Sequence, residues 1–74
     1  MAEYLYGRWA VLESLRAGRR QFEQLLLAEG IDEKGTVTDI VEAAAGRGIN
    51  MRRVPRRVID DLSKDANHQG VALR

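Results

Sequence analysis

Three stretches of the chain place apolar residues at helical spacing, namely residues 8–17, 36–45 and 56–66. In the second stretch, apolar residues recur at i, i+3, i+4, i+7 and i+8, which is typical of a helix with one buried face. In the third, Val58, Ile59 and Leu62 fall on the apolar side and are expected to face inward. The pattern therefore predicts three amphipathic helices.

Glycine and polar residues mark the ends of two of these helices. Gly18 follows the first stretch and suits a left-handed C-terminal cap. Thr36 and Asp39 resemble a weak capping box, with Asp in place of the usual Glu. We expect Gly46 and Gly48 to close the second helix.

The segments between the helices have the character of strands. Residues 22–28, FEQLLLA, end in an unbroken apolar run, which is typical of a short strand buried on both faces. Shorter strands are expected at residues 3–6, 49–54 and 70–74. Because a strand buried on both faces needs cover on both sides, helices should pack on each face of the sheet.

The expected order is strand, helix, strand, helix, strand, helix, strand. This alternation predicts an α/β fold, a three-layer α/β/α sandwich around a small mixed or mostly parallel sheet. Seventy-four residues form a single domain, residues 1–74. Since the last strand reaches the final residue, we expect the domain to be excised from a longer protein.

The amino-acid composition excludes several kinds of site. With no cysteine and one histidine, disulfides and a structural zinc site are excluded. The lack of cysteine fits a reducing compartment, and we expect a cytoplasmic protein. The N-terminal sequence has charges and no long apolar run, so we expect no signal peptide and no membrane partner.

Arginine dominates the basic residues, although the net charge is only +1. Ten of the twelve basic residues are Arg, and five of them lie between Arg47 and Arg57 with no acidic residue among them. A planar guanidinium binds phosphate with two hydrogen bonds, where an ammonium acts as a point charge. This placement favours nucleic-acid contact, with ordinary surface ion pairs as the alternative.

Candidate catalytic groups are few. Ser14 and Ser63 both fall on predicted helices, and His68 is the only plausible general base. Asp60 and Asp61 are adjacent on a predicted helix and cannot face one point, so we expect a solvated pair. We therefore expect a chain that is not catalytic by itself, with no metal site and no cofactor-binding residues.

Three short motifs carry a resemblance to a known family. They are YGRWAVLESL from Tyr6, LLLAEG from Leu25 and HQGVAL from His68. Together they resemble the N-terminal substrate-binding domain of the SpoU/TrmH family of RNA 2′-O-ribose methyltransferases, over nearly the whole chain. Among its branches, the chain is most similar by eye to the one that methylates a guanosine ribose in large-subunit ribosomal RNA.

The resemblance implies more than composition does. It implies an α/β/α fold like that of the kink-turn-binding ribosomal proteins, and RNA, ribosomal by this likeness, as the partner. A knotted catalytic domain would follow in the full-length protein, bind S-adenosylmethionine and form a homodimer. The domain on its own would be monomeric and would bind no cofactor.

The HQG sequence near the C-terminus leads into the last predicted strand. Gly70 is expected at a turn or bulge where only glycine is comfortable. His68 and Gln69 have two interpretations: their side chains satisfy the backbone of the turn, or they offer donors to RNA. We favour the first.

Seven residues are candidates for contact with RNA. Arg8 opens the first predicted helix, where backbone N–H groups would add to its charge. Such contacts position RNA without reading its sequence. The full candidate set is Arg8, Arg19, Arg20, Arg56, Arg57, His68 and Gln69.

Three rival functions remain open from the sequence. One is a free-standing RNA binder similar to the kink-turn-binding ribosomal proteins. Another is a protein-interaction domain with no RNA role. The most distant is a stand-alone enzyme with a site around His68.

Overall fold

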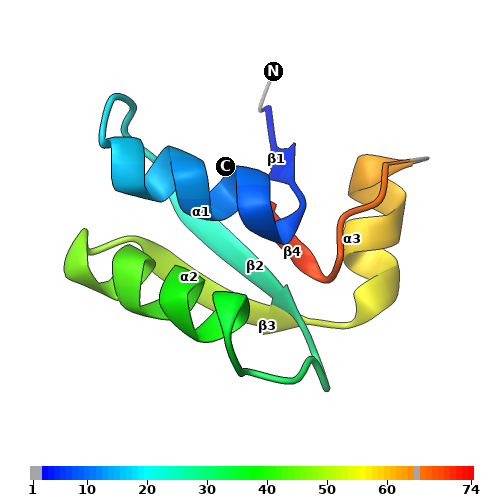
Figure 1. Cartoon of the computed structure of the whole chain (residues 1–74). Helices are drawn as coiled ribbons and strands as arrows, with labels where there is room; N and C mark the ends of the chain where they lie inside the picture. The colour runs from blue at the N-terminus through cyan, green and yellow to red at the C-terminus, as the bar shows by residue number, and fades with distance from the viewer. Residues whose placement is uncertain (1–2, 65) are drawn as a thin grey trace.

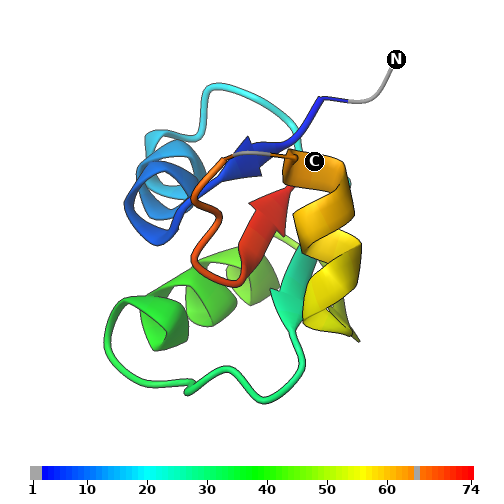
Figure 2. The ribbon, with the colours of Figure 1, turned by 90° about the vertical axis from the view of Figure 1, so that its right-hand side faces the viewer.

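A four-stranded sheet lies between two helices on one face and one helix on the other (Figures 1 and 2). The computed structural model describes residues 3–64 and 66–74. Its helices and strands, in chain order, are β1 (Leu5–Tyr6), α1 (Arg8–Ala17), β2 (Gln24–Ala28), α2 (Thr36–Gly46), β3 (Asn50–Val54), α3 (Arg56–Ser63) and β4 (Val71–Leu73). The three-layer sandwich and the predicted order of elements are confirmed.

The third helix is shorter than predicted, and Leu62, expected to face inward, is exposed. The helix was expected over residues 56–66 but ends at Ser63, where Lys64 takes a φ of 55°. A positive φ at a non-glycine residue breaks the helical path. Residue 65, which the prediction included, lies outside the described residues.

The sheet is mixed, with the strand order β1-β4-β2-β3. Only β2 and β3 pair in parallel, whereas β4 pairs antiparallel with both β1 and β2. The mostly parallel arrangement is therefore wrong, and the mixed one is right. The chain after α3 runs back alongside that helix before it enters the sheet, so β4 points opposite to the other strands (Figure 1).

Two hydrophobic clusters fill the space on either side of the sheet. In β2, Leu25 and Leu27 face the cluster under α1 and α2, while Leu26 and Ala28 face the cluster under α3. All four are buried. The prediction of a strand buried on both faces is confirmed, since successive strand residues point to opposite faces.

The helix ends only partly follow the sequence signals. Gly18 is the left-handed C-cap of α1, with φ 64° and ψ 18°. At the end of α2, Gly48 N–H donates to Ala45 O and Ile49 N–H to Ala44 O, which is the Schellman pattern. Here Gly48 supplies the positive φ, of 68°.

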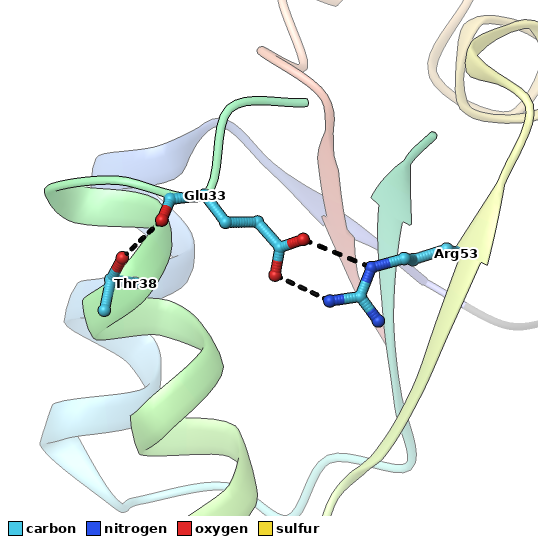
Figure 3. Close-up of polar contacts among 3 residues, drawn as sticks. All are labelled: Glu33, Thr38 and Arg53. Carbon is cyan, nitrogen blue, oxygen red and sulfur yellow. Dashed lines mark hydrogen bonds and ion pairs between the residues drawn. The ribbon is translucent and has the colours of Figure 1, made fainter. Parts of the chain in front are cut away.

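The predicted capping box at Thr36 is wrong. Gly35 takes the N-cap position with φ 55°, so Thr36 is already the first helical residue and its side chain makes no cap. Instead the Thr38 hydroxyl donates to the Glu33 carbonyl oxygen at 2.8 Å (Figure 3). The Glu33 carboxylate in turn accepts two hydrogen bonds from Arg53 of β3, which ties this loop to the edge of the sheet.

Candidate nucleic-acid interface

A tight turn at residues 68–71 organises one end of the molecule. Val71 N–H donates to His68 O at 3.1 Å, and the two residues between them, Gln69 and Gly70, have φ of 55° and 82°. Positive φ at both central positions is the pattern of a type I′ turn. The turn lies where β4 begins, beside the ends of β1 and β2.

Gly70 lies in a turn, as predicted, and the structure gives two reasons why glycine is required there. Its φ of 82° disfavours any side chain. A Cβ at this position would also lie 2.7 Å from Cδ1 of Ile31, in the loop after β2. The turn therefore packs directly against that loop.

His68 is buried and both its ring nitrogens are occupied. Its side chain is 5% exposed, and Nδ1 accepts a hydrogen bond from Gly70 N–H at 2.8 Å. Because Nδ1 is the acceptor, the proton of the neutral ring lies on Nε2, which faces Asp60 Oδ1 at 2.5 Å. The geometry matches the interpretation in which His68 satisfies the backbone of the turn.

Asp60 and Asp61 are both exposed, as expected of a solvated pair, but Asp60 has a further role. Its carboxylate is 56% exposed, yet it lies against His68 and links α3 to the turn. Asp61 is exposed. Two adjacent helical residues point in different directions, so one can face the turn while the other faces solvent.

Gln69 caps the N-terminus of α1, although the two are far apart in the sequence. Its side-chain Oε1 accepts a hydrogen bond from Arg8 N–H at 2.8 Å, and its carbonyl oxygen accepts one from Arg8 Nε at 3.1 Å. Gly7 N–H donates to the His68 carbonyl oxygen at 3.2 Å. The N-cap residue Gly7 offers no side-chain cap of its own, so the turn supplies acceptors that the helix N-terminus lacks.

Three of the candidate arginines lie at the same end as the turn. Strands β1, β2 and β3 all end there, and α1, α2 and α3 all begin there (Figure 1). Arg8 opens α1, and Arg56 and Arg57 open α3. Within the described residues these three arginines form no ion pair.

Similarity to known proteins identifies the family of the chain. Residues 4–74 match the family described as RNA 2′-O ribose methyltransferase substrate binding. The chain belongs to this family. The domain is 40% identical over 72 residues to an uncharacterized tRNA/rRNA methyltransferase of Mycolicibacterium vanbaalenii, and 42% identical over 72 residues to one of Mycolicibacterium smegmatis. These matches cover 97% of this chain and 23% of each relative, so the chain spans about a quarter of their length.

The substrate-binding domain does not bring all its candidate arginines together. Arg19 and Arg20 follow the C-terminus of α1, at the opposite end of the sheet from Arg8, Arg56 and Arg57 (Figure 1). The helix axis separates them, since α1 runs from one end of the sheet to the other. The single surface predicted from sequence is therefore two separate groups, and whether either contacts RNA stays a prediction.

Arg47 is a residue whose role the sequence did not reveal. From the C-cap position of α2 it donates through Nη1 to Leu15 O at 3.1 Å and through Nη2 to Arg20 O at 2.7 Å. It thereby satisfies a carbonyl in the last turn of α1 and fixes the loop that follows. Only its place in a run of arginines was visible in the sequence.

Two tyrosines flank the sheet on the α3 side. Tyr4 and Tyr6 stack with ring centroids 6.2 Å apart and pack against the cluster beneath α3. Burial, and secondly the neighbouring Tyr4, raises the pKa of Tyr6 above its ordinary value of 10.0.

The described residues add two facts about other kinds of site. Across residues 3–64 and 66–74, no helix is both long and apolar enough to cross a membrane. In the same residues, no group of three or more His, Asp or Glu side chains could hold a metal ion.

Proposed function

We propose that this domain recognises RNA for an RNA 2′-O-ribose methyltransferase and positions it for a catalytic domain carried elsewhere in the full-length protein. The observation that carries the proposal is the family match over residues 4–74. The curated relatives are described as tRNA/rRNA methyltransferases and are much longer than this chain, which supports a modular arrangement.

We place the primary contact at the end of the sheet that holds Arg8, Arg56 and Arg57. All three helices begin at this end of the sheet, and the positive ends of their dipoles favour phosphate. Arg8 uses Nε to hold Gln69 O, and its terminal guanidinium nitrogens make no hydrogen bond within the described residues. An arginine fixed at its Nε offers those nitrogens to a phosphate in a preorganised direction.

In this proposal His68 and Gln69 act mainly by position. The His68 ring is buried, and the Gln69 side-chain oxygen already accepts from Arg8. They set the turn, and the turn sets the start of α1 and the direction of Arg8. Among the contacts of the described residues, the Gln69 side-chain amide nitrogen is the side-chain donor of the pair that is left for RNA.

We further propose large-subunit ribosomal RNA as the substrate and S-adenosylmethionine as the methyl donor, bound by the catalytic domain and by no residue of this chain. The full-length protein would be a cytoplasmic homodimer, and this domain alone would be a monomer. The sequence motifs that begin at Tyr6, Leu25 and His68 support this finer assignment.

An amide chemical-shift titration with a ribosomal RNA hairpin tests the placement. We expect shifts at Arg8, Arg56, Arg57 and Gln69, and weaker binding as salt rises, because phosphate contacts release counterions. Shifts confined to the opposite end of the sheet would contradict the placement. An absence of shifts at low salt would contradict RNA binding and favour a protein-contact role.

A further inference from the structure

A shallow hollow opens at the end of the sheet opposite to Arg8. It has a volume of about 260 Å³ and is lined by Gln21, Phe22, Arg47 and Ile49. Gln21 and Phe22 precede β2, and Arg47 and Ile49 connect α2 to β3. The hollow is slightly smaller than pockets that enclose drug-sized ligands, so it suits a single planar group.

Phe22 sits among guanidinium groups at this hollow. The guanidinium carbon of Arg20 lies 5.7 Å from the centroid of the Phe22 ring, and that of Arg47 lies 5.8 Å from it. Aromatic rings and guanidinium planes are the surfaces on which proteins stack unpaired nucleobases. The hollow thus presents stacking surfaces and an opening of matching size.

The charge around the hollow favours an anion. No ion pair among the described residues involves Arg19, Arg20 or Arg47, while the nearby Glu23 is paired with Arg74 at 3.6 Å. Both terminal nitrogens of Arg47 already donate hydrogen bonds to backbone carbonyl oxygens. Arg19 and Arg20 are exposed and remain available for phosphate.

We propose that this hollow binds an unpaired nucleotide of the RNA, with its base against Phe22 and the Arg20 guanidinium and its phosphate on Arg19 and Arg20. The inference rests on the proposed RNA-recognition function and adds a second contact to it. Arg47 is a positioning residue here, because it holds the Arg20 backbone and packs on Phe22.

A second contact at this end changes how RNA lies on the domain. The two groups of arginines lie at opposite ends of a molecule whose principal extents are 30 × 27 × 19 Å. RNA that touches both must run across the domain and carry an unpaired base at one end. A substrate with a bulge or loop next to a helix meets this requirement.

The test titrates the chain with single-stranded hexa-adenylate, with adenosine 5′-monophosphate and with inorganic phosphate. NMR signals of Phe22 and Ile49 report on the hollow. Fluorescence of Trp9, the chain's only tryptophan, reports on the opposite end, because its side chain is 65% exposed beside Arg8. We expect both adenine probes to shift Phe22 and Ile49, and phosphate to shift only Arg19 and Arg20.

Two variants and a control make the result specific. Phe22→Leu keeps an apolar side chain against the core and removes the stacking ring, so hexa-adenylate binding at the hollow should weaken roughly tenfold. Arg20→Gln should weaken it by a similar factor, again roughly tenfold. Lys64→Gln removes one exposed positive charge from the C-terminal end of α3 and should leave it unchanged.

The possible outcomes distinguish the proposed nucleotide site at the hollow from the proposed RNA contact at Arg8. If the Phe22 and Ile49 signals do not move, or if Phe22→Leu binds hexa-adenylate as tightly as the parent chain, the proposed nucleotide site at the hollow is wrong. This holds even if Trp9 fluorescence still responds to RNA. Equal shifts with adenosine monophosphate and inorganic phosphate would also overturn the proposed site, because no base would then be recognised. A response at Phe22 without one at Trp9 would support the hollow and contradict the primary site at Arg8.

Discussion

The side-chain oxygen of Gln69 accepts a hydrogen bond from the backbone N–H of Arg8 at 2.8 Å, across 61 positions of sequence. The first N–H groups of a helix have no partner within the helix, and an N-cap side chain usually satisfies one of them. In α1 the N-cap is Gly7, which has no side chain, and the C-terminal turn takes over the task. The start of the first helix and the last turn of the domain therefore form one unit.

Replacing Gln69 by alanine should weaken this unit. Loss of a capping acceptor lowers the free energy of unfolding by about 1 kcal/mol. Gln69→Glu keeps an oxygen in reach of Arg8 and adds a charge that suits a helix N-terminus, so it should be close to neutral. Urea denaturation of both variants measures the difference. Equal stability of Gln69→Ala and the parent chain would show that the bond contributes nothing.

Gly70→Ala should be strongly destabilising, by about 2–4 kcal/mol, because backbone strain and a clash with Ile31 add together. Gly30→Ala is a matched control: Gly30 has φ 80°, close to the 82° of Gly70, but open space around its Cβ position. The loss of stability in Gly30→Ala should therefore reflect backbone strain alone.

Adding Ile31→Val to Gly70→Ala removes the Cδ1 atom that a new Cβ would meet at 2.7 Å. We expect the double variant to recover the steric part and return to the level of Gly30→Ala in thermal or urea unfolding. If Gly30→Ala were as damaging as Gly70→Ala, the contact with Ile31 would be unimportant.

The tautomer of His68 can be read directly, because it is the only histidine of the chain. Nitrogen NMR at a pH where the ring is neutral should show Nε2 protonated and Nδ1 bare, since Nδ1 accepts from Gly70 N–H. A protonated Nδ1 in the neutral ring would refute the arrangement.

Tyr6 makes the free energy of unfolding depend on pH in the alkaline range. Burial and then Tyr4 raise the pKa of Tyr6 above 10.0, so the folded chain holds this proton more tightly than the unfolded chain. The resulting stabilisation is fully present below pH 10, where Tyr6 keeps its proton in both states. It is lost as the pH rises above 10, because the unfolded chain ionises first.

Absorbance of phenolate across the alkaline range measures this effect, because Tyr4 and Tyr6 are the only tyrosines. We expect Tyr6 to ionise above pH 10.0 in the folded chain, and at a lower pH in Tyr4→Phe, which lacks the neighbouring charge. A titration of Tyr6 centred on 10.0 in the folded chain would contradict the raised pKa.

Much of the fold could be predicted from the sequence because its elements follow simple periods. The apolar stripe beginning at Val37 and the run at Leu25 to Ala28 each match the burial of α2 and β2. The place of β4 could not be predicted, because strand direction depends on the path of the chain after α3. That path leaves no periodic signal.

The candidate site was less accessible to sequence reasoning, because its key contacts join distant residues. The bond between Gln69 and Arg8 and the pairing of Asp60 with His68 depend on how α1, α3 and the turn pack. Similarly, Arg19 and Arg8 look like parts of one basic surface until α1 is seen to separate them. The abundance of arginine predicted phosphate binding, whereas the packing of the helices determines which arginines lie together.

The central claim is tested most directly by RNA affinity as a function of salt, for the parent chain and for a variant with Arg8, Arg56 and Arg57 all changed to Gln. For a single-stranded contact, loss of three phosphate contacts should flatten the slope of log affinity against log salt by about 2 and weaken binding by at least about tenfold at low salt. Lys64→Gln should leave affinity and slope near those of the parent. Parent-like affinity and an unchanged slope in the triple variant would contradict RNA recognition at this end of the domain.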